Sequence, residues 1–524
     1  MQDKLSRLSR EARQAVQQRS WPQVAMLAQQ IKQEFKDDPE GYFLAGLAAK
    51  SARANHQATS EFELALKLDA NRYDAAVELA NQYLFLLRHG AAYQLLKQHE
   101  HQLGNSPFYL DMAGKIYTAL GMHVDAWPLY EKANQLQPGL DTLRVNLASC
   151  GVLLGKVEQA RAIYQSLIDK YPEHQRNHYE LSKLEKAKDF SHLEQMKSIL
   201  NANHLPPEKN IFLYYAIGKE LEDLEQWQES FHYYQLAGES VLKVSNYDVS
   251  RDIQLIEKII QCCNADWLSK NAAVSNNDKP SKTPIFIVGL PRTGTTLTER
   301  IIASHSQVES ADETFFMQIA IRQSAGVGGF EDVDQAIIEA AAKGDIQTIG
   351  QSYLNSVAYR LTDKPNFIDG FPFNFLYLGF IAKALPNARI IYLRRNPMDA
   401  CFAMYKQSFF KFAYSLDNLG QYFVAQNKLR RHWQELLGER LIEIDYESLV
   451  AEPEQQTRAL LASLGLEFEE SCLEFDKNPT ASATASTLQV REKVHTRSVN
   501  KWKNFAEELA PLKQFLEAAG IDVS

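Results

Sequence analysis

A 34-residue period in the first half of the sequence constrains the fold more than any other feature. Four units begin at Pro39, Tyr73, Pro107 and Asp141 and follow one another without an insertion. A weaker copy begins at Ile211. A period of this length is typical of stacked helical pairs, each of which buries its apolar face against its neighbours. The repeat therefore predicts an all-α helical solenoid.

Small residues occupy positions 8 and 20 of all four units and position 27 of two of them, which would let two antiparallel helices approach closely. An aromatic residue at position 24 of three units is expected to fill the space between neighbouring pairs, and a proline at position 32 of two units is expected to end the second helix. This pattern resembles the tetratricopeptide repeat, and residues 5–36 and 175–204 look like degenerate copies. A helical domain with coincidental spacing is the alternative. The solenoid could bind a protein partner on its concave surface, or it could serve as a scaffold or mediate a homodimer.

The composition excludes several classes of protein. The chain has 524 residues and a formal net charge of −9, which argues against general nucleic-acid binding because such binding depends on a strongly basic surface. No uninterrupted apolar run of about 18 residues occurs, so we expect no membrane span. The five cysteines form no CxxC pair and no metal-ligand spacing. Sparse cysteines are typical of a reducing compartment, and we expect a cytoplasmic protein.

The sequence changes character after residue 267. Residues 268–283 are polar and lack periodicity, so we interpret them as a linker between a repeat domain (1–267) and a second domain (284–524). Beyond the linker, short apolar runs alternate with helical stretches, which predicts an α/β P-loop domain with a central parallel sheet and helices on both faces. The predicted strands are Ile285–Val288, Asn366–Ile368, Arg389–Leu393 and Leu441–Asp445, and the predicted helices are Thr295–Ser304, Phe373–Leu385, Pro397–Phe410 and Pro453–Leu464.

The segment PIFIVGLPRTGTTLTERIIASH (284–305) has the pattern of a buried strand, a glycine-bounded turn and an amphipathic helix. Gly289 and Gly294 have the spacing of a phosphate-binding loop, in which backbone N–H groups and a helix N-terminus hold an anion. A nucleotide triphosphatase or kinase would carry lysine where this chain has Thr295. The basic residue is instead Arg292, inside the loop. The turn therefore suits one phosphate with a less charged group attached, and a kinase is disfavoured.

The loop Pro-Arg-Thr-Gly-Thr-Thr resembles the 5′-phosphosulfate loop of sulfotransferases, whose sulfonyl donor is 3′-phosphoadenosine 5′-phosphosulfate (PAPS). Arg395-Asn396-Pro397 is similar to the segment that binds the donor's 3′-phosphate, for which the planar fork of arginine is suited. IDYESLVAEPE (444–454) resembles an element whose tyrosine, here Tyr446, contacts the donor. The resemblance implies that the loop residues bind the donor; they are Arg292, Thr293, Gly294, Thr295 and Thr296.

A further segment, STLQVREKVHTRSVNKW (486–502), resembles the closing segment of tyrosylprotein sulfotransferases. This similarity implies that Ser486 lies near the transferring sulfonyl group and Lys501 near the nucleotide. A repeat half joined to such a domain resembles bacterial tetratricopeptide-repeat sulfotransferases. No metal is expected, because arginine and helix N–H groups can neutralise the phosphosulfate.

Glu313 is the candidate general base. It lies 21 residues after Arg292, the spacing that tyrosylprotein sulfotransferases use for their base glutamate, and burial would raise its pKa toward the useful range. Arg292 and Ser486 would then stabilise the transferring group. The neighbouring Asp312 is better explained as a residue that caps the next helix. His305 is an alternative base, but its place after the loop helix favours a helix-end role.

Two positions depart from the family's pattern. A serine of the 3′-phosphate site is replaced by Ala403, and a lysine that stabilises the transition state is replaced by Gly370. Loss of one hydrogen bond to a charged group costs on the order of 1.5–3 kcal/mol. Lys406 or Ser408 could compensate for the first change, and the candidates for the second are Lys364, Arg491 and Lys493.

The sequence therefore predicts a PAPS-dependent sulfotransferase that transfers a sulfonate group to an acceptor hydroxyl. The acceptor could be a peptide or protein tyrosine or a small hydroxyl compound, and the repeat domain would aid acceptor binding or oligomerisation. The aromatic run 408–423 could line the acceptor pocket, although its helical spacing favours core packing. The alternative is a repeat scaffold with a nucleotide-binding domain whose catalysis is weakened.

Overall fold

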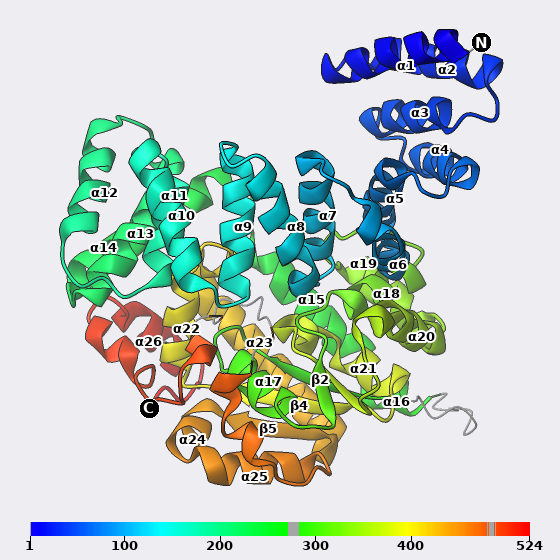
Figure 1. Ribbon diagram of the computed structural model, residues 1–524. Coiled ribbons are helices and arrows are strands. Elements are labelled where there is room, and N and C mark those ends of the chain that lie inside the picture. The colour runs from blue at the N-terminus through cyan, green and yellow to red at the C-terminus, as the bar shows by residue number, and fades with distance from the viewer. Residues whose placement is uncertain (1, 271–281, 479, 481–486, 488) are drawn as a thin grey trace. The chain divides into compact units, whose positions relative to one another are not determined.

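The computed structural model describes residues 2–270, 282–478, 480, 487 and 489–524 (Figure 1). The chain divides into two compact units: Met1–Cys150 with Ser356–Arg360, and Gly151–Asn355 with Leu361–Ser524. The second unit contains the last helices of the repeat region as well as the sheet. The domain limits at residues 267 and 284 stay a prediction, and most of the predicted linker lies outside the described residues.

Every unit of the 34-residue repeat forms a helical pair whose first helix begins at the first residue of the unit. The predicted solenoid of tetratricopeptide-like pairs is therefore confirmed. The pairs are α3 (Pro39–Ser51) with α4 (Asn55–Leu68), α5 (Tyr73–Phe85) with α6 (His89–His99), α7 (Pro107–Ala119) with α8 (His123–Leu136), and α9 (Asp141–Leu153) with α10 (Val157–Lys170). The weaker copy forms α13 (Ile211–Asp223) and α14 (Trp227–Val244).

The remaining helices of the first half flank these pairs. They are α1 (Gln2–Gln17), α2 (Trp21–Glu34), α11 (Gln175–Leu184), α12 (Ser191–Ala202), α15 (Val249–Cys262) and α16 (Ala265–Ser269). The two regions that resembled degenerate copies, 5–36 and 175–204, thus contain two helices each. In Figure 1 the colour passes from blue to green along this succession of antiparallel helices.

The glycine at position 8 of a unit packs against the aromatic ring at position 24 of the same unit. A Cβ atom built on Gly114 would lie 2.7 Å from the ring of Tyr130, and one built on Gly218 would lie 2.9 Å from the ring of Tyr234. The expected close approach of the two helices is thus confirmed. The aromatic ring packs inside its own pair, a contact that the repeat pattern alone did not predict.

This packing makes a substitution of Gly114 informative. Alanine in place of glycine normally stabilises a helix by up to about 1 kcal/mol. We expect Gly114→Ala to destabilise the protein instead, by about 1–3 kcal/mol, because the added methyl group meets the buried ring of Tyr130. Thermal unfolding followed by circular dichroism measures the effect.

The matched control is Gly90→Ala in α6, where the nearest atom would lie 4.0 Å from the new methyl group. This variant should be neutral or slightly more stable than the wild type. If Gly114→Ala is as stable as Gly90→Ala, the glycine–aromatic contact does not determine how closely the pair packs.

The second unit holds a five-stranded, fully parallel sheet in the order β2-β3-β1-β4-β5. The strands are β1 (Thr283–Gly289), β2 (Val308–Ser310), β3 (Asn366–Asp369), β4 (Arg389–Arg394) and β5 (Leu441–Asp445). The predicted parallel sheet is confirmed, and four of its strands lie where the sequence placed them. The fifth, β2, was missed because it has three residues, of which Val308 alone is fully buried.

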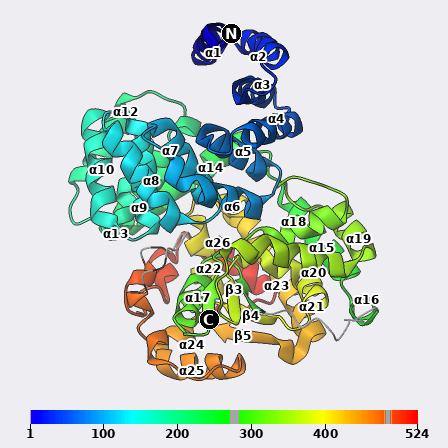
Figure 2. The ribbon, with the colours of Figure 1, turned by 45° about the vertical axis from the view of Figure 1, so that its right-hand side comes forward.

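Helices cover both faces of the sheet, as predicted. On one face Ile287 and Ile391 share a core with Ile302 of α17 (Thr295–Ala303) and Leu460 of α25 (Pro453–Ser463). On the other face Tyr392 accepts a hydrogen bond from the Gln426 side chain of α23 (Leu416–Leu437). Both views show α25 beside β5 together with α24 (Tyr446–Ala451) (Figure 1, Figure 2).

Further helices complete the α/β region. They are α18 (Phe316–Ser324), α19 (Gln335–Lys343), α20 (Ile346–Val357), α21 (Leu378–Ala384), α22 (Pro397–Tyr405) and α26 (Ala510–Ala518), with the 3₁₀ helices η4 (Pro372–Tyr377), η5 (Lys411–Tyr414) and η10 (Lys501–Phe505). The predicted helix 373–385 is thus a 3₁₀ turn followed by α21. The predicted helix 397–410 ends at Tyr405, beyond which Phe409 and Phe410 pack on each other. Among the described residues, no helix is long and apolar enough to cross a membrane.

Candidate active site

The predicted site residues follow the carboxyl ends of the strands. Arg292 follows β1, Glu313 follows β2, Arg395 follows β4 and Tyr446 follows β5, while Asp369 is the last residue of β3. Because all five strands are parallel, these ends meet at one edge of the sheet, where α/β proteins bind their ligands. The strand order places Glu313 at one side of this edge and Tyr446 at the other, with the phosphate-binding loop in the middle.

The loop between β1 and α17 has the backbone of an anion cradle. Gly289 and Gly294 have positive φ angles of 145° and 101°, and Arg292 between them has a φ of 68°. The Thr293 hydroxyl donates a hydrogen bond of 2.6 Å to the carbonyl of Leu290, which closes the turn. The loop leads into the N-terminus of α17, whose first N–H groups and dipole favour an anion.

Tyr446 and Arg395 hold this loop from the neighbouring strands. The Tyr446 ring lies against Gly294, where an added Cβ would be 2.6 Å from the ring, and the Arg395 guanidinium lies over the same ring at 4.7 Å. Arg395 donates from Nη1 to the carbonyl of Arg292 at 2.7 Å and from Nη2 to the carbonyl of Ser498 at 2.6 Å. Its Nε is buried without a hydrogen-bond partner among the described residues, so it can donate to a bound anion.

Gly294 is therefore the loop position most sensitive to substitution. Gly294→Ala forces a left-handed residue to carry a Cβ and pushes that Cβ into Tyr446, which together cost about 1–3 kcal/mol. We expect a lower melting temperature and at least about tenfold weaker nucleotide binding, because the cradle and the ring that supports Arg395 both shift. Differential scanning fluorimetry and titration calorimetry measure the two effects.

The matched control is Gly465→Ala, which has a φ of 74° but open space around the added methyl group. This variant carries the backbone strain without the clash, so it should lose some stability and keep wild-type nucleotide affinity. Equal losses of affinity in both variants would mean that the Tyr446 contact is irrelevant to the loop.

The β1–β4–β5 side of the edge is basic. Burial and the nearby Arg395 lower the pKa of Arg292 to about 10. Burial also lowers the pKa of Lys406, at the end of α22, to about 8, although the carboxylate of Glu222 raises it. Lys501 forms an ion pair of 2.6 Å with the same Glu222. Two lysines therefore share one carboxylate, which leaves positive charge that a multiply charged anion could balance.

The β2–β3 side is acidic. Burial, together with Glu299, Asp312 and Asp369, raises the pKa of Glu313 to about 8. Burial and Asp312 raise the pKa of Glu299, on α17, to about 8, and burial raises that of Asp369 to about 6. A carboxyl group with a raised pKa is a stronger base once it is ionised, which is what removal of a hydroxyl proton requires.

Gly370 lies against this acidic group. A Cβ built on Gly370 would lie 2.7 Å from Oε2 of Glu299, and the Glu299 carboxylate also accepts a hydrogen bond from the Ser310 hydroxyl. Asp369 accepts hydrogen bonds from the Thr314 hydroxyl at 2.6 Å and the Tyr353 hydroxyl at 3.0 Å. The space where the family's pattern has a lysine stem is thus occupied by a carboxyl group.

Most of the alternative candidates have other partners. One ring nitrogen of His305 lies 2.9 Å from the carbonyl of Glu467 and the other 3.1 Å from the backbone nitrogen of Gln307, which fits a helix-end role. Lys364 donates to the carbonyl of Val308 at 2.8 Å. Arg491 donates to the carbonyl of Leu153 at 3.1 Å. Ser486 lies outside the described residues.

The aromatic run 408–423 is largely core. Phe410 and Phe412 are buried, and Phe412 stacks on Tyr422 with a centroid distance of 3.9 Å. Phe409 is exposed. Nearer to the candidate base, Phe315 is exposed and lies 4.5 Å from the buried ring of Phe371.

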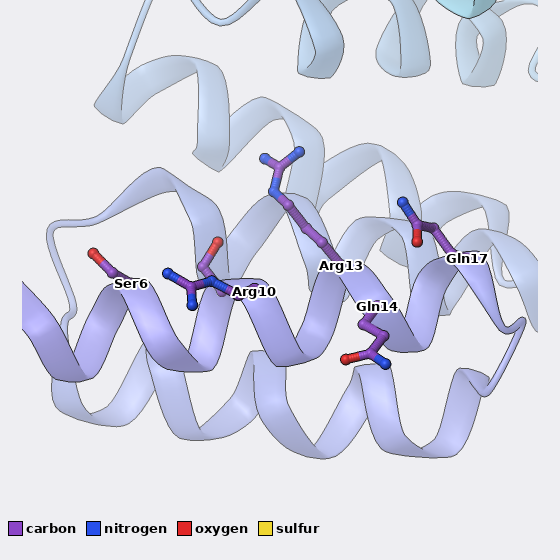
Figure 3. Close-up of a pocket in the computed structure, with 6 residues that line it drawn as sticks. Ser6, Arg10, Arg13, Gln14 and Gln17 are labelled. Atoms are coloured by element: carbon purple, nitrogen blue, oxygen red, sulfur yellow. The ribbon is translucent and has the colours of Figure 1, made fainter.

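A hollow of about 620 Å³ lies elsewhere, on α1 in the first compact unit. Figure 3 shows its polar side chains projecting from that helix. They include Arg13, which is ion-paired with Glu40 at 2.7 Å and therefore belongs to the packing of the repeats. Within the described part of the chain, no group of three or more His, Cys, Asp and Glu side chains is arranged to hold a metal ion.

The sequence motifs did not predict Glu222, Glu299 or Asp369 as members of the candidate site. One feature of the sequence could have pointed to Glu299: it is an acidic residue next to the apolar positions of the helix that follows the phosphate-binding loop. Asp369 ends an apolar strand, which is the position where α/β proteins carry site residues. No feature of the sequence pointed to Glu222, because it is 184 residues from its partner Lys406.

Comparisons with known proteins agree with this geometry. The sequence model of the Sulfotransferase family matches residues 284–470. An uncharacterized protein of Aquifex aeolicus (strain VF5) is 28% identical over 422 residues, which make up 78% of this chain and 55% of that protein. Protein-tyrosine sulfotransferase 1 of Danio rerio is 24% identical over 243 residues, 44% of this chain and 67% of that protein. The chain thus spans about half the length of the Aquifex aeolicus relative.

Solved structures are similar to each half. The sulfotransferase domain of the Synechococcus PCC 7002 olefin synthase is 20% identical and aligns with 47% of this chain and 98% of its own, with a TM-score of 0.34. YrrB, a tetratricopeptide-repeat protein with an unusual peptide-binding site, is 16% identical and aligns with 39% of this chain and 96% of its own, with a TM-score of 0.29.

The family match begins at the second residue of β1 and ends beyond α25, so it contains the phosphate-binding loop, Glu313, Arg395 and Tyr446. Residues 284–470 thus match the Sulfotransferase family, and tetratricopeptide-like helical pairs precede them in this chain.

Proposed function

We propose that the protein transfers the sulfonyl group of PAPS to an acceptor hydroxyl, with Glu313 as the general base. The observation that carries the proposal is the division of one sheet edge into a basic side and an acidic side. Arg292 and Arg395 belong to the basic side, and Glu313 and Asp369 belong to the acidic side. Such a division lets one site bind an anionic donor and deprotonate a neutral acceptor.

The donor's phosphates fit the basic side. The 5′-phosphate would accept hydrogen bonds from the loop N–H groups and the hydroxyls of Thr295 and Thr296, and the 3′-phosphate would lie near Arg395 and Lys501. The fit is supported by the glycine-bounded cradle and by the buried Nε of Arg395, which has no partner among the described residues.

The transfer itself needs little covalent chemistry from the protein. The acceptor oxygen forms a bond to sulfur, the bond between sulfur and the bridging phosphate oxygen breaks, and the acceptor proton moves to the Glu313 carboxylate. Arg292 would stabilise the charge that develops on the bridging oxygen. Adenosine 3′,5′-bisphosphate leaves with the electron pair of the broken bond.

The acceptor that we propose is a hydroxyl on a peptide, with tyrosine as the first candidate. Protein-tyrosine sulfotransferase 1 of Danio rerio is named for such an acceptor, and the exposed ring of Phe315 lies two residues from Glu313. An exposed aromatic ring can pack against a phenol ring. The repeat region would aid the binding of the peptide or assembly into a homodimer, and a small phenol is the second candidate.

The test is the appearance of a sulfonate group on an acceptor. The protein is incubated with PAPS and one acceptor in each of four separate reactions. The four acceptors are a tyrosine peptide, its phenylalanine counterpart, a small phenol and an aliphatic alcohol. Mass spectrometry should detect one added sulfonate group on the tyrosine peptide and none on the phenylalanine peptide. Binding of adenosine 3′,5′-bisphosphate without transfer to any acceptor would contradict the proposed activity.

A second candidate function is a nucleotide-binding scaffold with weak catalysis. It is favoured by the Glu299 carboxyl group that lies against Gly370, where the family's pattern has a lysine that stabilises the transition state. This candidate predicts nucleotide binding that is as tight as in the first proposal but no turnover with the acceptor panel. The same mass-spectrometric measurement therefore separates the two.

A further inference from the structure

Glu222, a residue of the repeat region, contacts two lysines on the basic side of the site. It lies in α13, its side chain is 6% exposed, and it belongs to the same compact unit as the sheet. Its Oε1 accepts hydrogen bonds from Lys406 at 2.8 Å and from Lys501 at 2.6 Å. Its Oε2 accepts from Lys406 at 3.0 Å and from the Tyr234 hydroxyl at 2.9 Å. One carboxylate of a repeat helix thus holds two lysines of the α/β region.

Both lysines are tied to the segment that carries Arg395. Lys406 directly follows α22, whose N-terminus comes right after Arg395 and Asn396. Lys501 is held near the first turn of α22, because the Asp399 carboxylate accepts hydrogen bonds from the backbone N–H groups of Asn500 at 2.6 Å and Trp502 at 3.0 Å. The two lysines therefore both lie beside α22, the helix that follows Arg395.

The charges in this cluster do not balance. Lys406 and Lys501 contact Glu222, Arg292 lies near Lys406, and Arg395 lies near Arg292. These four cations outnumber the two nearby carboxylates, Glu222 and Asp399. The Lys406 side chain is 17% exposed and so has little water around it, and a phosphate dianion would supply two negative charges to the cluster. Lys406 also lies 4.7 Å from the Phe402 ring, which fixes its stem.

We infer that Glu222 is a positioning residue that holds Lys406 and Lys501 as one cationic pair for the 3′-phosphate of the nucleotide, an inference that rests on the proposed PAPS site. Lys406 then supplies the donor that Ala403 lacks. Each ammonium group has three N–H donors. Lys406 directs two of them and Lys501 one to Glu222, so each lysine keeps a donor for the phosphate.

The surrounding packing makes Glu222 a fixed point. Phe231 of α14 stacks on Tyr405 at 5.5 Å, and Trp227 of the same helix meets Phe505 at 5.5 Å. Phe505 in turn lies 4.3 Å from Phe402. A lysine is a flexible point charge, and a carboxylate anchored in such a seam restricts where its ammonium group can lie.

Glu222 also keeps Lys406 charged. The groups that face Lys406 are Glu222 from α13, Lys501 from η10, Arg292 from the phosphate-binding loop and the Phe402 ring from its own helix. Burial and the two other cations lower the pKa of Lys406, and Glu222 is the group that raises it. Without the Glu222 charge, this pKa falls below about 8 and Lys406 loses its proton at neutral to alkaline pH.

The test compares Glu222→Gln with the wild type by titration calorimetry at pH 6.0 and pH 8.0. The probes are adenosine 3′,5′-bisphosphate and adenosine 5′-phosphate, which differ in the 3′-phosphate. We expect Glu222→Gln to weaken bisphosphate binding at least about tenfold at pH 8.0 and by less at pH 6.0, where the acid restores the lysine charge. Binding of adenosine 5′-phosphate should stay within about threefold of the wild type at both pH values.

The control is Glu229→Gln, which removes the ion pair of 2.6 Å with Lys197 on the surface of the same region. It should bind both nucleotides as the wild type does. If Glu222→Gln does not fold, Lys406→Met provides a second test. It should reduce the preference for adenosine 3′,5′-bisphosphate over adenosine 5′-phosphate at least about tenfold at pH 6.0.

Three results would overturn the inference: unchanged or tighter bisphosphate binding by Glu222→Gln at pH 8.0, equal losses for the two nucleotides, or a loss that is independent of pH. The last two would assign Glu222 a merely structural role. A wild-type protein that binds neither nucleotide would instead contradict the proposed function, so the two failures are distinguishable.

Discussion

Replacing Glu313 by glutamine should lower the rate of sulfonyl transfer by about 10²–10⁴-fold while nucleotide binding stays nearly unchanged. Glutamine keeps the size and hydrogen-bonding capacity of the side chain but cannot accept the acceptor's proton. The rate is measured from sulfonated product under saturating PAPS, and binding is measured with adenosine 3′,5′-bisphosphate.

The pH dependence gives this prediction a second readout. Glu313 acts as a base only when ionised, and its pKa is raised to about 8. Transfer by the wild type should therefore increase with pH between about 6.5 and 9, and the residual rate of Glu313→Gln should lack that increase. Asp312→Asn is the matched control. It removes a neighbouring charge that raises the pKa of Glu313, so it should shift the rising limb to lower pH and leave transfer intact.

Replacing Arg395 by alanine should weaken the binding of adenosine 3′,5′-bisphosphate by about 10–100-fold, because charge-assisted hydrogen bonds to the 3′-phosphate are lost. The same change should affect adenosine 5′-phosphate much less. Arg395 also lies over Tyr446 and donates to the carbonyl of Arg292, so a smaller loss through the loop is expected for both nucleotides.

Arg395→Lys separates these effects, because lysine keeps the charge but loses the planar fork. It should bind the bisphosphate with intermediate affinity. Arg458→Ala, at an exposed arginine of α25 that pairs with Glu454 at 2.8 Å, serves as the surface control and should bind normally. A wild-type preference for the bisphosphate that survives Arg395→Ala would remove Arg395 from the 3′-phosphate site.

The repeat half could be predicted almost to the residue. Four first helices begin at Pro39, Tyr73, Pro107 and Asp141, where the sequence units begin, because the register of small and aromatic residues is set by local helix packing. The boundary of the compact units could not be predicted in this way. It falls after Cys150, inside the regular repeats, because it depends on long-range packing rather than on the repeat pattern.

The sheet and the phosphate-binding loop were also readable from the sequence. Buried strands appear as apolar runs, and Gly289 and Gly294 occupy backbone conformations that favour glycine. The edge strand β2 was not readable, because three residues with one buried valine carry no pattern. The helices α18, α19 and α20 between β2 and β3 were not predicted from the motifs either.

The residues of the candidate site also fall into a group that the sequence predicts and a group that it does not. Residues inside motifs, such as Arg292 and Arg395, could be named in advance, whereas Glu299 and Glu222 act through contacts that only the fold creates. Glu299 reaches Gly370 from another element, and Glu222 reaches Lys406 and Lys501 from the repeats. The charge balance of the site therefore depends on residues that no local motif contains.

The most direct test of the proposed division of the sheet edge is a crystal structure of the protein with adenosine 3′,5′-bisphosphate and a tyrosine peptide. We predict that the 5′-phosphate lies in the loop that contains Arg292, the 3′-phosphate within hydrogen-bond distance of Arg395, and the tyrosine hydroxyl within hydrogen-bond distance of Glu313. A nucleotide bound away from this edge, or an acceptor hydroxyl beyond the reach of Glu313 while both ligands are bound, would contradict it.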